Sequence, residues 1–235
     1  MFERYERQIH LIGKIGQEKL SKSKVLVVGA GGLGSSAIAY LAAAGVGKIG
    51  IVDRDKVEES NLQRQIIHAG KLGKNKAESA AEFVKILNPE VEVEIYPHEF
   101  DNEKAENIVR KYDVVLGCPD NFQTRFLINE VCVKLKKPFV HAAIFGWEGE
   151  AGVFLGRPCY RCYIPYGVES IGSAVIGTTA GIFGCVQALE TIKIITGCGD
   201  TLYGKILRVD TKSWQFFELK IKSNPKCPVC SKEVR

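Results

Sequence analysis

Short apolar runs alternate with helix-like segments along the first 145 residues of the chain. Residues 25–28 and 49–52 are apolar, which is typical of strands buried on both faces of a sheet. Between them, residues 35–44 are small and apolar and predict a helix that ends at Gly45. The alternation continues with predicted helices at 74–88, 102–111 and 121–135, and with predicted strands at 91–96, 114–116 and 138–145. Strands alternating with helices predict a mostly parallel, doubly wound α/β sheet of the Rossmann-like kind.

The last third of the chain is less regular. Residues 150–155 are predicted to return antiparallel to 138–145, because the connection is too short for a crossover helix. The segments that follow are, in order, a long loop rich in glycine and serine at 163–179, a largely apolar and buried helix at 180–196, and strands at 205–210 and 214–222. At the other end of the chain, residues 3–21 predict one or two short helices on the outside of the domain.

The composition fits a globular protein. Of the 235 residues, 46% are hydrophobic, which is enough for a sizeable core. The net charge is +5, but the lysines are scattered, and the densest run, at 19–24, lies at a predicted helix end and indicates a solvated face. The first ten residues are too charged for a signal peptide, and no apolar run approaches the length of a membrane span. We therefore expect a cytoplasmic protein with no nucleic-acid and no membrane partner.

A glycine motif follows the first predicted strand. Gly29, Gly31, Gly32 and Gly34 stand in a G-x-G-x-x-G pattern, which allows a tight turn and a close approach of backbone N–H groups to a phosphate. The helix that follows favours an anion at its N-terminus. Asp53 ends the second strand, about 20 residues further on, where an acid commonly binds ribose hydroxyls. The motif predicts nucleotide binding and leaves NAD, FAD and ATP open.

Four of the eight cysteines form two Cys-x-x-Cys pairs. Cys159 and Cys162, together with Cys227 and Cys230, supply four thiolates at the spacing of a tetrahedral zinc site. Disulfides are disfavoured in a reducing cytosol, and neither pair has the strand-to-helix context of a thioredoxin motif. Four protein ligands leave no open position, so we expect a structural Zn²⁺ that staples the C-terminal tail to the domain.

The other four cysteines, Cys118, Cys132, Cys185 and Cys198, have weaker signals. Cys132 and Cys185 lie within predicted helices and are expected to be small core residues. Cys118 precedes Pro119 and Asp120, so it is either near the chemistry or, as we favour, a cysteine at a strand end.

Several motifs together resemble those of the E1-like adenylating enzymes of the ThiF/MoeB/HesA group. They appear in the family's order and spacing and are Arg4-Tyr5-x-Arg7-Gln8, the glycine motif, Asp53, Asn61-Leu62-x-Arg64-Gln65, Gly73-x-x-Lys76, Asp120-Asn121 and the two Cys-x-x-Cys pairs. They cover nearly the whole chain. The resemblance implies a single E1-like adenylation domain over 1–235, with N-terminal helices at 1–22, a nucleotide-binding core at 23–156, and a crossover loop, buried helix, strands and zinc staple at 157–235.

The resemblance also implies an activity. Enzymes of this kind join the C-terminal glycine carboxylate of a ubiquitin-like sulfur carrier of the ThiS/MoaD type to AMP, and they release pyrophosphate. Such a carboxylate has a pKa of about 3.5 and is already an anion at pH 7, so no general base is required. The chemistry needs the triphosphate to be neutralised. The implied cofactors are ATP and a catalytic Mg²⁺, beside the structural Zn²⁺.

Individual residues then receive expected roles. Arg64 and Lys76 are expected to bind the phosphates, and Asp120 is expected to hold Mg²⁺ or to help position it. By resemblance, Asp53 binds the ribose, Asn61 helps to order the phosphate site, and Gln65 and Asn121 belong to the same nucleotide site. Arg7 is expected to reach the ATP of the other subunit in a homodimer. Taken alone, Arg64 and Lys76 fit surface charges, Asp120 fits a helix N-cap and Arg7 fits an exposed helix residue. Their joint occurrence favours the functional interpretation.

One departure from the family pattern changes the expected chemistry. Many members carry a cysteine in the loop before the long helix, and that position falls here at Ser170, or at Ser173 if the loop slips. A serine cannot act as a low-pKa thiolate. We therefore expect an acyl adenylate that passes directly to a sulfurtransferase, a cysteine desulfurase or another sulfur donor, as in thiamin- or molybdopterin-type biosynthesis.

Three alternatives stay open at this stage. The first is adenylation of a peptide or small-molecule carboxylate, which the missing cysteine favours and the carrier-type pattern disfavours. The second is an NAD-dependent oxidoreductase, which leaves Asn61, Arg64, Lys76 and the cysteine pairs unexplained. The third is a non-catalytic scaffold of the same fold, against which the presence of Arg64, Lys76 and Asp120 argues.

Overall fold

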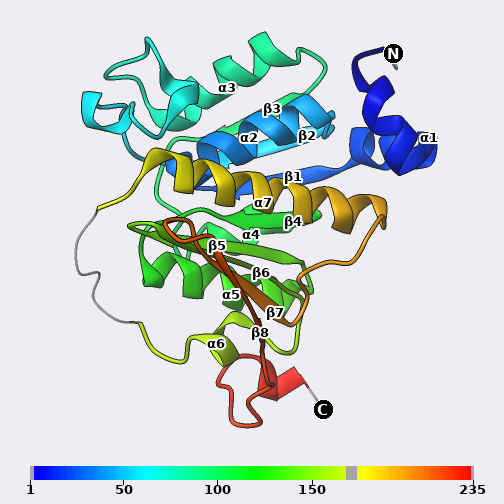
Figure 1. Ribbon diagram of the computed structural model, residues 1–235, viewed down its shortest axis with the longest axis vertical. Coiled ribbons are helices and arrows are strands. Elements are labelled where there is room, and N and C mark those ends of the chain that lie inside the picture. Colours follow the sequence, from blue (N-terminus) through cyan, green and yellow to red (C-terminus); the bar gives the residue numbers. More distant parts are fainter. Residues whose placement is uncertain (1–2, 168–173, 234–235) are drawn as a thin grey trace.

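One sheet contains the eight strands that the described residues form. The structure, a computed structural model, describes residues 3–167 and 174–233. The strands lie in the order β3-β2-β1-β4-β5-β6-β7-β8 (Figure 1). Five of them run parallel, namely β1 (Lys24–Val28), β2 (Lys48–Val52), β3 (Glu92–Tyr96), β4 (Val114–Gly117) and β5 (Phe139–Phe145). The prediction of a doubly wound, mostly parallel sheet is confirmed.

The C-terminal strands are antiparallel, as predicted. The strand β6 (Glu148–Phe154) pairs antiparallel with β5, and β7 (Lys205–Asp210) and β8 (Gln215–Lys220) follow in the same sense. Two residues, Gly146 and Trp147, connect β5 to β6, and Gly146 has a φ of +58°, which favours glycine in this tight turn. All six residues of β8, the last strand of the sheet, are exposed.

Helices cover both faces of the sheet and enclose two apolar cores. One face carries α1 (Glu6–Lys22), α2 (Gly32–Ala44), α3 (Lys76–Leu87) and α7 (Gly177–Thr196). The other face carries α4 (Ala105–Val109), α5 (Phe122–Leu135) and α6 (Tyr160–Tyr163). The helices α2 and α7 pack side by side across one face (Figure 1). Four short 3-10 helices complete the described chain, η1 (Glu3–Tyr5), η2 (Glu59–Asn61), η3 (Ile66–His68) and η4 (Cys230–Glu233).

Two helix starts differ from the prediction. The helix α2 begins at Gly32 and not at residue 35, because the end of the glycine motif already forms its first turn. The helix α4 has only five residues in place of 102–111. Its start is delayed because Asp101 Oδ1 accepts hydrogen bonds from the N–H groups of Glu103 (3.1 Å) and Lys104 (3.0 Å), which holds this segment in a turn.

The helix α7 also differs from the prediction of a buried helix at 180–196. It begins at Gly177 and is buried on one side only. Phe183 is fully buried, whereas Leu189 is 54% exposed. The helix α1 is interrupted at Gly13, which has a φ of +72°, and this agrees with the expected one or two short helices. Within residues 3–167 and 174–233, no helix combines the length and the apolar character needed to cross a membrane.

Candidate nucleotide site and cysteine cluster

The glycine turn between β1 and α2 has no room for side chains at two positions. Gly29 has a φ of +99°, and a β-carbon there would lie 2.8 Å from the carbonyl oxygen of Cys118. A β-carbon at Gly34 would lie 2.1 Å from the carbonyl oxygen of Gly29. The turn therefore packs directly against the chain that follows β4, and this brings Asp120 to the side of the glycine motif.

Asp53, which follows β2, holds the glycine turn from the other side. Its Oδ2 accepts a hydrogen bond from the N–H of Ala30 (2.7 Å), and its Oδ1 accepts one from the N–H of Asp55 (2.9 Å). Burial raises the pKa of the Asp53 carboxyl, while the two N–H groups and the nearby Lys76 ammonium oppose this shift. Each carboxylate oxygen keeps a further lone pair with which to accept a hydrogen bond from a ribose hydroxyl.

The segment that contains η2 and η3 lies over the glycine turn. Asn61 orders this segment, because its Oδ1 accepts the N–H of Glu58 in a capping box. A β-carbon at Gly32 would lie 3.5 Å from Arg64 Cδ, and one at Gly31 would lie 3.7 Å from Gln65 Nε2. Gln65 Oε1 is buried and finds no hydrogen-bond partner among the described residues. An unpaired buried oxygen of this kind points to a water or a ligand in the site.

Lys76 is the first residue of α3 and is buried, with 7% of its surface exposed. Its Nζ lies 3.2 Å from Asp55 Oδ2. Asn75 caps the helix by accepting the N–H groups of Ala77 and Glu78, and its Nδ2 donates to the carbonyl oxygen of Asp53 (3.0 Å). The cap therefore ties the lysine to the end of β2 and to the acid beside the glycine turn.

Asp120 and Asn121 have different local roles. The N-cap of α5 is Asn121, whose Oδ1 accepts the N–H of Thr124 (2.8 Å). The Asp120 carboxylate is exposed, and its hydrogen bond among the described residues is a long one of 3.4 Å from Asn121 Nδ2. Asp120 is thus not the N-cap of α5, which excludes the non-functional interpretation of this residue. The Asp120 carboxylate is available to a cation.

Arg125 belongs to this group and was not predicted from the sequence. It is 7% exposed, its Nη2 donates to the carbonyl oxygen of Pro119 (2.9 Å), and its Nε is buried without a partner among the described residues. It therefore holds the loop that carries Asp120. No helical spacing in the sequence indicates this contact, because Arg125 reaches back to Pro119, which lies before α5.

Arg7 lies away from the glycine turn of its own chain. The start of α1 packs at the C-terminal end of α2, where Gln8 Nε2 donates to the carbonyl oxygen of Ala44 (2.8 Å). The glycine turn is at the opposite end of α2, whose 13 residues span about 20 Å. In Figure 1, α1 lies at the right, across the molecule from the cyan segment with η2 and η3. The exposed Arg7 is therefore too distant to contact its own glycine turn.

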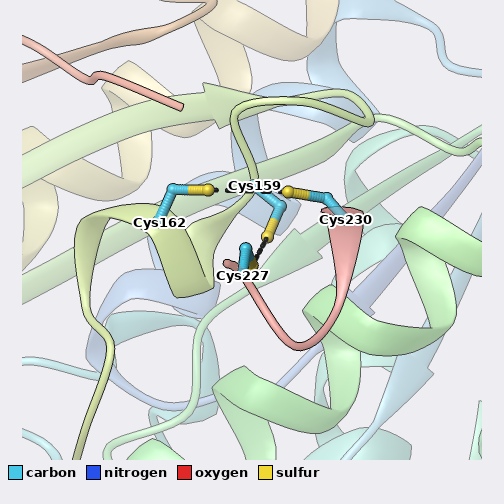
Figure 2. A group of neighbouring side chains, drawn as sticks. All are labelled: Cys159, Cys162, Cys227 and Cys230. Atoms are coloured by element: carbon cyan, nitrogen blue, oxygen red, sulfur yellow. Dashed lines mark hydrogen bonds between the residues drawn. The ribbon is translucent and has the colours of Figure 1, made fainter. Parts of the chain in front are cut away.

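The two cysteine pairs come together, as predicted. Figure 2 shows Cys159, Cys162, Cys227 and Cys230 with their sulfur atoms facing one another, and all four Sγ atoms lie within 4.8 Å of each other. The N–H of Asn224 donates to Cys162 Sγ (3.4 Å), and Asn129 Nδ2 donates to Cys159 Sγ (3.7 Å). Such N–H donors favour thiolates. Four sulfur ligands in a closed cluster fit Zn²⁺.

The remaining thiols offer no activated nucleophile at the glycine turn. Burial raises the pKa of Cys118 to about 12, and its thiol donates to Gln187 Oε1 (3.3 Å). Cys132 is buried in the core as expected, whereas Cys185 is only half-buried. Ser170 and Ser173, at the position of the family cysteine, lie outside the described residues.

A glycine turn at the carboxyl ends of parallel strands, with an acid and two cations around it, defines a nucleotide-binding α/β protein. Comparison with known families is more specific. The ThiF family profile matches residues 5–229, and the chain belongs to this family. The E1-like interpretation of the sequence is confirmed.

Three similar proteins cover nearly all of this chain. A SAMP-activating enzyme E1 of Haloferax volcanii is 44% identical over 97% of this chain and 88% of its own length. A sulfur carrier protein adenylyltransferase of Thermus thermophilus is 42% identical over 98% of this chain and 91% of its own. An adenylyltransferase and sulfurtransferase MOCS3-1 of Zea mays is 44% identical over 98% of this chain, which spans 52% of that relative.

The fold also has a solved counterpart. A crystal structure of E. coli MccB with SeMet MccA superimposes with a TM-score of 0.88 at 23% sequence identity, over 97% of this chain and 74% of that one. At this level of identity, the likeness establishes the fold.

Proposed function

We propose that the protein is an ATP-dependent adenylyltransferase whose substrate is the C-terminal glycine carboxylate of a ubiquitin-like sulfur carrier. The observation that carries this proposal is the group of Arg64, Lys76 and Asp120 around the glycine turn of a ThiF family chain. The Thermus thermophilus relative, which is 42% identical over nearly the whole chain, is named a sulfur carrier protein adenylyltransferase, which supports the carrier over a small carboxylate.

In the proposed reaction, the carrier's carboxylate is the nucleophile. It is ionised at pH 7, so no residue has to remove a proton from it. One carboxylate oxygen attacks the α-phosphorus of ATP, and the bond from that phosphorus to the oxygen bridging to the β-phosphorus breaks. Pyrophosphate leaves with the electron pair of that bond, and the carrier remains as an acyl adenylate.

The residues around the glycine turn act by charge and by position. Arg64 and Lys76 neutralise the phosphates, which lets an anion approach phosphorus. Asp120 would hold Mg²⁺, which supplies further neutralisation of the phosphates when bound. The ribose hydroxyls donate to Asp53. The other proposed nucleotide-site residues, which shape the backbone around ATP, are Gly29, Gly31, Gly32, Gly34, Asn61, Gln65 and Asn121.

The acyl adenylate is proposed to pass directly to a sulfur donor. Cys118 is a buried, protonated thiol with a pKa of about 12, and it does not supply a thiolate near the glycine turn. A sulfurtransferase or a cysteine desulfurase is therefore the proposed partner that forms the thiocarboxylate, in thiamin- or molybdopterin-type biosynthesis. The match to a relative named both adenylyltransferase and sulfurtransferase supports this pairing of activities.

Isotope exchange between pyrophosphate and ATP tests the proposed function. The purified protein is incubated with labelled pyrophosphate, ATP and Mg²⁺, with and without candidate carriers that end in Gly-Gly. We expect exchange only with a carrier, and no exchange with the same carrier lacking its last glycine. Exchange with no carrier but with a peptide or small carboxylate would replace the proposed substrate.

We also propose that the protein is a homodimer in which Arg7 completes the partner's site. An apolar groove of about 250 Å³ runs between α1, α2 and α7, and its lining includes Gln8, Tyr40 and Leu189. Tyr40 is 59% exposed and Leu189 is 54% exposed. A second copy that covers this groove would bury these side chains and bring a second α1, with its Arg7, to the molecule.

Mixing two inactive variants tests this arrangement. Arg7→Ala and Asp120→Ala are each expected to be inactive alone. In a mixed dimer, the site on the Arg7→Ala chain has its own Asp120 and receives Arg7 from the partner. Random exchange of subunits makes half of the dimers mixed, with one intact site of two, so about a quarter of the wild-type exchange rate should return.

Two further variants serve as controls for the dimer. Leu189→Asp places a charge in the groove and is expected to give a monomer by light scattering and no recovery on mixing. Ile86→Asp places the same charge on α3, where Ile86 is 82% exposed outside the groove, and should leave a dimer. If mixing restores no activity while both variants exchange subunits, Arg7 does not act across the dimer.

We further propose a structural Zn²⁺ in the four-cysteine cluster and a cytoplasmic location. All eight cysteines are free thiols in this structure, and four of them form the cluster. Unpaired thiols and thiolate-bound zinc are both typical of a reducing compartment.

A further inference from the structure

His68, the last residue of η3, lies fully buried between the glycine turn and α3. Its Nε2 is 2.8 Å from the carbonyl oxygen of Ala30, and its Nδ1 is 2.8 Å from Ser79 Oγ. A carbonyl oxygen can only accept a hydrogen bond, so Nε2 carries the proton. Burial lowers the pKa of His68, which keeps the ring neutral at pH 7, and Nδ1 then accepts from the Ser79 hydroxyl.

The contact with His68 fixes one peptide group of the glycine turn. The N–H of Ala30 already donates to Asp53 Oδ2 (2.7 Å), and its carbonyl now accepts from His68, so both sides of Ala30 are held. In a trans peptide, the C=O of Ala30 and the N–H of Gly31 point in opposite directions. Because the carbonyl is turned towards His68, the N–H of Gly31 is turned away from it.

The N–H of Gly31 is a backbone donor at the start of α2. Gly31 is the N-cap residue of this 13-residue helix and is partly exposed. Among residues 3–167 and 174–233, its N–H has no hydrogen-bond partner. The direction of the Gly31 N–H depends on the plane of the Ala30–Gly31 peptide, which the hydrogen bonds of Ala30 to His68 and Asp53 hold.

The second hydrogen bond of His68 reaches the helix of the phosphate-binding lysine. Ser79 stands three residues after Lys76 in α3, which is nearly one helical turn. The ring of His68 therefore links the glycine turn to α3 through two hydrogen bonds, one on each side.

We propose that His68 is a positioning residue for the nucleotide, and this rests on the proposed ATP site. It holds the Ala30–Gly31 peptide so that the Gly31 N–H faces the phosphates of ATP. It also fixes the position of this donor relative to Lys76. A histidine that only fills the core would stabilise the fold. Its replacement would then weaken the binding of ATP no more than the binding of the carrier.

Two substitutions of similar polarity separate these roles. In His68→Gln, the side-chain amide nitrogen can occupy the place of Nε2 and donate to the carbonyl oxygen of Ala30. In His68→Asn, the shorter side chain reaches only the place of Nδ1, near Ser79, and the bond to Ala30 is lost. Both variants replace the ring by a smaller amide, so both lose packing in the same place.

The test measures the dissociation constant for ATP by calorimetry, the Michaelis constants for ATP and for the carrier in the exchange assay, and thermal unfolding. We expect His68→Asn to weaken ATP binding about tenfold, as the loss of one buried hydrogen bond implies, with the Michaelis constant for the carrier unchanged. His68→Gln should stay within about threefold of the wild type, although both variants unfold at a lower temperature than the wild type.

The outcomes are distinguishable from failure of the proposed function. A wild-type protein that binds no ATP overturns the ATP site itself. A wild type that binds ATP, with His68→Asn binding it equally well or both variants weakened equally, overturns the positioning role alone. If His68→Asn does not fold, Ser79→Ala takes its place. This variant keeps the ring and its hydrogen bond to Ala30 but removes the hydrogen bond that holds the ring to α3. About threefold weaker ATP binding is expected, because the ring is then held on one side only. Unchanged ATP binding would overturn the link to α3.

Discussion

Replacing Asp120 by alanine is expected to abolish adenylation while the fold stays intact. The carboxylate is exposed, and the N-cap of α5 is Asn121, so the helix keeps its cap when the carboxylate is removed. Among residues 3–167 and 174–233, the carboxylate has only the long, exposed hydrogen bond from Asn121, so no buried group there loses a partner. The substitution is expected to lower the rate of adenylation, because it removes an oxygen ligand for Mg²⁺ beside the triphosphate. Removing a group that stabilises developing charge at phosphorus costs on the order of 100- to 1000-fold in rate.

The measurement is pyrophosphate exchange at saturating ATP and carrier, repeated over a series of Mg²⁺ concentrations. Asp120→Asn is the conservative companion and should also be strongly impaired, since an amide carries no charge. Asp200→Ala is the matched control, because Asp200 is an exposed acid on a different loop and should retain full activity. Unchanged exchange in Asp120→Ala, with a normal melting temperature, would discard the assignment of this site.

The parallel strands of the core could be predicted from the sequence because burial on both faces of a strand requires a continuous apolar run. Val25, Leu26, Val27 and Val28 are all buried, so these four positions of β1 are apolar, and only Lys24 at the start of the strand is exposed. The exposed side of α7 could not be predicted in this way. This helix is apolar nearly all round, and periodicity therefore predicts burial everywhere, including at Leu189. An exposed apolar surface cannot be distinguished from core in a single sequence.

Most residues of the candidate site were predictable, but their contacts were not. The glycine turn and Asp53 follow from residue types at fixed places relative to the strands, whereas Arg64 and Lys76 were singled out by the resemblance to the ThiF/MoeB/HesA group. Asp120 and Asn121 are adjacent and both are good N-caps, so only the geometry of α5 distinguishes the cap from the free carboxylate. His68 bonds to Ala30, which is 38 positions away along the chain. No local periodicity reports a polar contact of that kind, because it depends on how the segments pack in three dimensions.

Removing zinc is expected to release the C-terminal segment and to leave the ATP site functional. Cys227 and Cys230 lie on the chain after β8, and with Val133 and Cys159 they make a small core of their own, separate from the two cores of the sheet. In Figure 1 this region lies at the bottom, below α5 and α6. Without the metal, the sulfur atoms lose their common ligand and the segment loses its main attachment.

Cys227→Ser, or the wild type treated with a chelator, should lose one equivalent of zinc per chain, measured by atomic absorption. A loss of ~4 kcal/mol would lower the melting temperature of a chain of this size by about 10 °C. Trypsin should then cut at Lys222 or Lys226, which flank the freed segment, while ATP still binds. Cys198→Ser, a cysteine outside the cluster, should keep its zinc and resist trypsin at these sites. A wild-type protein purified without chelator that contains no zinc, and whose melting a chelator does not change, would contradict the metal assignment.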